Sequence, residues 1–116
     1  MTTIRINWEM PELEAKGHAG GGPRGQNIIC AGISAVTMAL LNTLRQYLDD
    51  GKDVEWQINE DTGYLKIRAK PSAINREMVM HFYEMAYIGL KAIEQEYPEE
   101  IKIKEVQDGG NVGQDS

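Results

Sequence analysis

Two stretches of apolar residues with helical spacing, separated by alternating runs, constrain the fold of this chain most strongly. In the first stretch, apolar residues fall at positions 29, 33, 36, 40, 44 and 47, which places them on one face of a helix. This spacing predicts a helix from about Ile29 to the sequence LDDGKD, where Gly51 is a typical stop.

The second helical stretch opens at Pro71 and Ser72 and runs to Tyr97, because Pro98 cannot continue a helix. Its expected buried stripe consists of Ile74, Met78, Phe82, Met85, Ile88 or Gly89, Ala92 and Ile93. Further methionine and aromatic residues lie outside this stripe, namely Met80, Tyr83 and Tyr87. Two apolar sides favour a helix packed between its own sheet and a partner chain, and hence a homodimer. A deeper core within one chain is the alternative.

The remaining segments alternate between apolar and polar residues, as half-buried strands do. Residues 4–8 predict one strand, ELEAKGHA a second strand ending near His18, VEWQI and YLKIRA a hairpin around NEDTG, and EEIKIKEV a last strand. The predicted order is β-β-α-β-β-α-β. We therefore expect an α+β fold in which two helices pack on a mostly antiparallel sheet, with one compact domain over residues 1–106. The polar, glycine-rich residues 107–116 are expected to form a flexible tail.

Composition excludes several classes of function. The formal net charge is −6, so the chain has no electrostatic reason to bind nucleic acid. No apolar run is expected to be long enough to cross a bilayer, and the N-terminus lacks the core of a signal peptide, which together predict a cytoplasmic protein that does not bind membranes. The single cysteine excludes an internal disulfide and is either a small buried residue or a reactive thiol.

That cysteine, Cys30, is expected at or just inside the first turn of the first helix, across a glycine-rich segment from His18. The positive end of a helix favours a thiolate, which is the nucleophilic form of cysteine. A histidine at a strand end can lie close to the start of the following helix, where it can take the thiol proton and later protonate a leaving amine. Unpaired amide groups near Cys30 can supply an oxyanion hole. The alternative is that Cys30 is a small packed residue and that His18 is solvated, with neither taking part in catalysis.

The loop between them, residues 20–27, is too rich in glycine for regular structure. Its glycines allow a substrate backbone to approach closely or the loop to move aside. The residues that we assign to a substrate loop are Gly20, Gly21, Gly22, Arg24 and Gly25. Arg24 can meet an acidic substrate segment, and a solvated arginine is the alternative.

The sequence GHAGGGPRGQNIICAGISAVT resembles the signature of the ribosomal-processing cysteine proteases, the Prp family. Members carry Gly-His-Ala, a variable loop, an acidic residue, two aliphatic residues and Cys-Ala, with a serine four residues past the cysteine. The matching positions are Gly17, His18, Ala19, Gly25, Ile28, Ile29, Cys30, Ala31 and Ser34. The resemblance extends over about residues 2–105.

The resemblance implies that Cys30 is the nucleophile and His18 the general base of a cysteine endopeptidase that acts through an acyl-enzyme. It further implies a cytoplasmic homodimer without metal or cofactor. The implied substrate is the N-terminal extension of large-subunit ribosomal protein number twenty-seven. Two alternatives stay open: a prophage-borne paralogue that trims capsid or scaffold protein, and an inactive dimeric module of the same fold that binds peptides.

Two supporting residues are assigned from the same motif. Asn27 stands where the family usually has aspartate, and it can accept backbone hydrogen bonds without adding charge. Ser34 lies one helical turn past Cys30 and shares its face, so its hydroxyl can hydrogen-bond in the site; packing or capping is the alternative.

Overall fold

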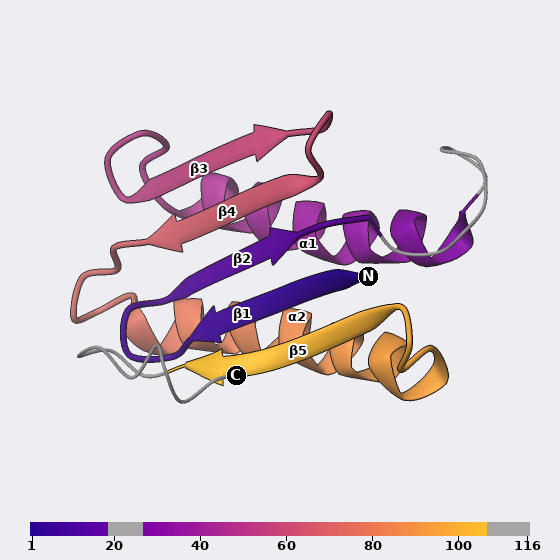
Figure 1. Cartoon of the computed structure of the whole chain (residues 1–116). Coiled ribbons are helices and arrows are strands. Elements are labelled where there is room, and N and C mark those ends of the chain that lie inside the picture. Colours follow the sequence, from indigo (N-terminus) through magenta and orange to yellow (C-terminus); the bar gives the residue numbers. More distant parts are fainter. Residues whose placement is uncertain (19–26, 107–116) are drawn as a thin grey trace.

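The computed structural model describes residues 1–18 and 27–106 of the chain, and it has the predicted order of elements (Figure 1). The elements are β1 (Thr2–Asn7), β2 (Glu12–Lys16), α1 (Ile28–Tyr47), β3 (Val54–Asn59), β4 (Tyr64–Ala69), α2 (Arg76–Glu96) and β5 (Ile101–Val106). The predicted tail, residues 107–116, lies outside the described residues, so its flexibility stays a prediction.

The five strands form one sheet in the order β3-β4-β2-β1-β5, and both helices cover the same face of it (Figure 1). β1 pairs in parallel with β5, and the other three pairings are antiparallel, which confirms a mostly antiparallel sheet. Because β2 and β3 both run antiparallel to β4, they run parallel to each other, and α1 is the crossover between them. The first turn of α1 therefore lies toward the end of the sheet at which β2 finishes.

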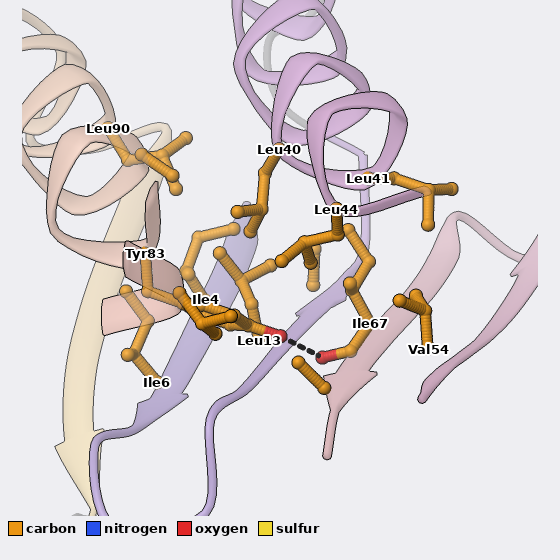
Figure 2. Packing of buried hydrophobic residues seen from close by; sticks show 14 of the residues in the cluster. Ile4, Ile6, Leu13, Leu40, Leu41, Leu44, Val54, Ile67, Tyr83 and Leu90 are labelled. Atoms are coloured by element: carbon orange, nitrogen blue, oxygen red, sulfur yellow. Dashed lines mark hydrogen bonds between the residues drawn. The ribbon is translucent and has the colours of Figure 1, made fainter. Parts of the chain in front are cut away.

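The core lies between the helices and the inward-facing residues of the strands (Figure 2). The strands contribute alternate residues, among them Ile4, Ile6, Leu13, Val54 and Ile67, and α1 contributes Leu40, Leu41 and Leu44. Burial of each such side chain contributes about 1.5–3 kcal/mol relative to exposure. The buried hydroxyl of Tyr83 donates to the carbonyl oxygen of Ile67 at 3.2 Å, which satisfies the one polar group of that large side chain.

The buried face of α2 differs from the expected one. Val79, Tyr83, Ala86 and Leu90 are the buried residues of this helix, whereas Met85 and Ile88 of the expected stripe are 59% and 61% exposed. Both faces of α2 are apolar, so helical periodicity alone does not identify the face that meets the sheet. The helix also begins at Arg76 rather than at Ser72, because residues 73–75 form a turn first.

The expectation that no apolar run is long enough to cross a bilayer is wrong for α1. By length and composition, α1 is long and apolar enough to cross a membrane. The core helix of a soluble protein meets the same criterion. In this structure α1 buries one face, made of Ile33, Thr37, Leu40, Leu41 and Leu44.

The backbone at Gly17, just past the end of β2, is held from both sides. Its N–H donates to the carbonyl oxygen of Gly63 at 2.8 Å, and its own carbonyl accepts from the hydroxyl of Thr2 at 3.3 Å. Gly17 has a φ of 95°, a left-handed conformation that favours glycine. A Cβ at this position would collide with the carbonyl oxygen of Met1. The residue before His18 therefore has to be glycine.

We expect Gly17→Ala to destabilise the fold more than Gly51→Ala does. Both glycines have positive φ values, but a Cβ at Gly51 has no atom within 4 Å, so Gly51→Ala carries only the backbone strain of about 1–2 kcal/mol. Gly17→Ala adds the displacement of the Met1 carbonyl. Urea denaturation of the two variants measures the difference in the free energy of unfolding, and equal losses would contradict this account of the Gly17 corner.

Candidate active site

Cys30 is the third residue of α1 and is partly exposed, with a free thiol. This confirms the predicted position in the first helical turn. The residue is therefore not part of the fully buried core. The partial positive charge at the start of the helix favours negative charge on a group placed there.

Asn27 caps the helix that carries Cys30. Its backbone is extended, and its side-chain oxygen Oδ1 accepts from the N–H of Ile29 at 2.9 Å and from the N–H of Cys30 at 3.0 Å. The prediction that Asn27 can accept backbone hydrogen bonds is therefore confirmed. Asparagine provides the same acceptor as aspartate but adds no charge beside Cys30.

The capping contacts change the expectation for an oxyanion hole. The N–H of Cys30 is bound by Oδ1 of Asn27, and the N–H of Ala31 donates to the carbonyl oxygen of Asn27 at 3.1 Å. The amides of Ile29, Cys30 and Ala31 are thus already paired in this structure. The expected unpaired donors are not found at these three positions.

His18 follows Gly17 at the end of β2, and its side chain is exposed. The imidazole lies against the backbone of Gly63 in the turn between β3 and β4. A Cβ built at Gly63 would lie 2.8 Å from Nε2 of His18 and 2.9 Å from Cε1. The end of β2 and the first turn of α1 both lie toward the same end of the molecule, on the right of Figure 1.

Within the described residues, no hydrogen bond joins the imidazole of His18 to the thiol of Cys30. The pairing of these two side chains therefore stays a prediction. The assigned loop residues Gly20, Gly21, Gly22, Arg24 and Gly25 lie outside the described residues.

Ser34 is exposed one turn past Cys30 on α1, so its side chain does not pack against the sheet. Its carbonyl oxygen accepts from the hydroxyl of Thr37 at 3.2 Å, and that hydroxyl also bonds the carbonyl of Ile33. The exposed hydroxyl of Ser34 is compatible with the supporting role assigned to it.

Gly63 and its neighbour Tyr64 also lie at the Gly17 corner, and no motif in the sequence predicts a role for either residue. The hydroxyl of Tyr64 donates to Oε2 of Glu14 at 2.8 Å, and burial, followed by that carboxylate, raises the pKa of Tyr64 to about 12. Tyr64 therefore stays neutral at pH 7 and acts as a hydrogen-bond donor rather than as a base. The turn sequence NEDTG was the available signal, but it does not show that the turn contacts His18.

Other surface features of the described chain involve none of the assigned site residues. A hollow of about 130 Å³ on β3 and β4 is lined by Glu55, Trp56, Gln57, Lys66 and Arg68, none of which is an assigned site residue. No group of three or more histidine, cysteine or acidic residues in ranges 1–18 and 27–106 is arranged to hold a metal ion. His81, on α2, is exposed between Glu77 and Glu84 at 3.8 Å from each.

Known proteins resemble this chain along most of its length. A relative from Staphylococcus aureus, the ribosomal processing cysteine protease Prp, is 26% identical over 101 residues, which span 87% of this chain and 92% of the relative. A Bacillus subtilis protein of the same name is 27% identical over 94 residues, covering 78% of this chain and 81% of its own.

Solved structures show the same fold. The S. aureus ribosomal processing protease Prp, in complex with a covalently linked product peptide, superposes with a TM-score of 0.77 at 24% identity and covers 91% of this chain and 100% of its own. A Streptococcus mutans protein has a TM-score of 0.70 at 30% identity, covering 92% and 93%. The sequence profile of the family described as cysteine protease Prp matches residues 1–102. The chain therefore belongs to the cysteine protease Prp family.

Proposed function

We propose that this protein is a cysteine endopeptidase in which Cys30 is the nucleophile and His18 the general base. The observation that carries the proposal is the position of Cys30, a partly exposed thiol in the first turn of α1, in a chain of the cysteine protease Prp family. The imidazole of His18 is exposed, and it lies at the end of the sheet where α1 begins. This position supports the assignment of His18 as the base.

The reaction proceeds in two steps. His18 takes the thiol proton, the sulfur of Cys30 forms a bond to the scissile carbonyl carbon, and the carbon–nitrogen bond breaks as the imidazolium returns the proton to the leaving amine. Water then attacks the carbonyl carbon of the thioester while His18 takes a proton from that water. The carbon–sulfur bond breaks, the carboxylic acid leaves, and the imidazolium returns the proton to the sulfur of Cys30. No external oxidant, reductant or metal enters this balance.

The substrate that we propose is the N-terminal extension of large-subunit ribosomal protein number twenty-seven, cleaved in the cytoplasm. Relatives that match this chain over most of its length are named for ribosomal processing, and the S. aureus structures hold substrate or product peptides. Those findings describe the relatives, and they support the same class of substrate here. Asn27 and Ser34 support the site, the first by capping α1 and the second as an exposed hydroxyl on the face of Cys30.

We further propose that the protein is a homodimer that uses the outer face of α2. Met85 and Ile88 are the exposed large apolar residues within this helix, at 59% and 61%. The inner face of α2 packs in the core, and its outer face keeps these apolar residues exposed. A second copy of the chain that covers them would bury apolar surface and so stabilise the dimer.

We expect Cys30→Ala and His18→Ala to abolish cleavage of a synthetic peptide carrying the extended N-terminus of that ribosomal protein. The first variant removes the nucleophile, and the second removes the only base assigned to it. Mass spectrometry of the peptide after incubation measures both. His81→Gln is the matched control, since His81 is exposed on α2 and should leave cleavage unchanged. If the wild type and Cys30→Ala leave the peptide equally intact, the proposed cleavage of this substrate is refuted.

We expect Asn27→Ala to lose about 1 kcal/mol of stability and to slow cleavage, because two amides in the turn that holds Cys30 lose their acceptor. Asn27→Asp keeps the acceptor and should retain both properties. Thermal unfolding and peptide cleavage test this pair. Asn75→Ala is the control, since Asn75 precedes α2 and its side chain makes no capping bond. A loss with Asn75→Ala as large as with Asn27→Ala would mean that the Asn27 cap has no particular effect.

We expect Ile88→Glu to convert the dimer to a monomer, because it places a charge on the proposed interface. Ile58→Glu, at a similarly apolar exposed position on β3 at the far edge of the sheet, should leave the dimer intact. Sedimentation velocity distinguishes the two states. A monomeric wild type, or a dimer that survives Ile88→Glu, would contradict the proposed interface.

A further inference from the structure

The turn between β3 and β4 contacts the predicted catalytic histidine through Gly63, which has no side chain. Gly63 has a φ of 67°, and a Cβ built there would lie 2.8 Å from Nε2 of His18, 2.9 Å from Cε1 and 2.9 Å from the carbonyl oxygen of Gly17. Separations below 3.0 Å are essentially never seen for real Cβ atoms. The imidazole therefore occupies space that only glycine leaves open at position 63.

The same turn is fixed to the backbone that leads into His18. The carbonyl oxygen of Gly63 accepts from the N–H of Gly17 at 2.8 Å, and the N–H of Gly63 donates to the carbonyl oxygen of Glu60 at 3.3 Å. Within the turn, the side-chain oxygen of Asn59 accepts from the N–H of Asp61 at 3.0 Å and from the N–H of Thr62 at 3.3 Å. The surface under the imidazole is thus a hydrogen-bonded turn rather than a loosely held loop.

We propose that Gly63 is a positioning residue for the reaction: its backbone forms the surface against which the imidazole of His18 is held for proton transfer with Cys30. The inference rests on the proposed role of His18 as general base. An exposed histidine otherwise samples several rotamers, and restricting them raises the fraction of molecules in which the base is correctly placed. Gly63 itself touches neither the substrate nor the sulfur in this account.

Gly63→Ala, compared with Gly51→Ala, separates positioning from general backbone strain. Both glycines have positive φ values, but a Cβ at Gly51 meets open space in the α1–β3 connection. With the extended ribosomal-protein peptide as substrate, we expect Gly63→Ala to lower kcat at least tenfold while KM changes less than threefold. We expect Gly51→Ala to keep the kcat of the wild type. Equal effects of the two substitutions on kcat would overturn the proposal.

The side-chain NMR signals of the histidines give a readout that does not depend on activity. The chain has two histidines, and His81 lies on the exposed surface of α2. In Gly63→Ala the Cε1–H signal of His18 should shift while that of His81 stays in place, with His81→Gln assigning the two signals. An unchanged His18 signal would mean that the ring does not rest on Gly63.

A double-mutant cycle covers the case in which Gly63→Ala folds poorly. If the imidazole is part of the obstruction, Gly63→Ala should lower the folding equilibrium constant by a smaller factor in a His18→Ala background than in the wild type. The Gly17 carbonyl oxygen at 2.9 Å and the positive φ of Gly63 contribute in both backgrounds. Equal losses in both backgrounds would assign the cost to the Gly17 carbonyl and the positive φ of Gly63, and would overturn the proposal.

The outcomes separate this inference from the proposed function. If His18→Ala cleaves normally, the role of His18 as base fails, whatever the signals of Gly63→Ala show. If His18→Ala abolishes cleavage while Gly63→Ala matches Gly51→Ala, the base stands and the positioning role of Gly63 is refuted.

Discussion

The backbone at Gly17 joins three segments, and the geometry of the candidate active site depends on that junction. Its N–H binds the β3–β4 turn at Gly63, its carbonyl accepts from Thr2 at the start of β1, and the adjacent Met1 carbonyl leaves no room for a side chain. His18 is the next residue. Its exposed imidazole consequently projects from a corner defined by backbone contacts on both sides, rather than from an unconstrained loop.

The position of Cys30, the other predicted catalytic residue, depends on the N-terminal cap of α1. Cys30 is placed by the start of α1, and that start is defined by the side chain of Asn27, which accepts from two of the first helical amides. The cap consumes donors that would otherwise be available near the sulfur, and it does so without a charge. The cysteine is therefore influenced by the helix terminus and not by a neighbouring carboxylate at position 27.

Local patterns in the sequence predicted the elements of this fold well, because helical spacing and alternation are properties of neighbouring residues. The hairpin around NEDTG and the helix carrying Cys30 are examples. The buried face of α2 was predicted wrongly because Met85 and Ile88 are as apolar as the residues that face the sheet. The start of α2 was also misplaced, since Ser72 enters a turn before the helix begins.

Contacts between distant segments could not be predicted in the same way. Neither the parallel pairing of β1 with β5 nor the contact between Gly63 and His18 has a signature in the residues themselves, because each depends on how the crossovers bring segments together. The motif resemblance predicts His18 and Cys30 as the catalytic pair without showing what surrounds them. The structure adds the cap under Cys30 and the turn under His18, and these local supports explain why glycine and asparagine stand where they do.

The central claim is that the imidazole at position 18 acts on the sulfur at position 30. The most direct test is the rate at which iodoacetamide alkylates Cys30 at neutral pH, followed by mass spectrometry in the wild type, in His18→Ala and in His81→Gln. The account predicts that the wild type and His81→Gln react at the same rate, faster than free cysteine, and that His18→Ala reacts several-fold more slowly. Equal rates in the wild type and His18→Ala would show that the two side chains do not act together.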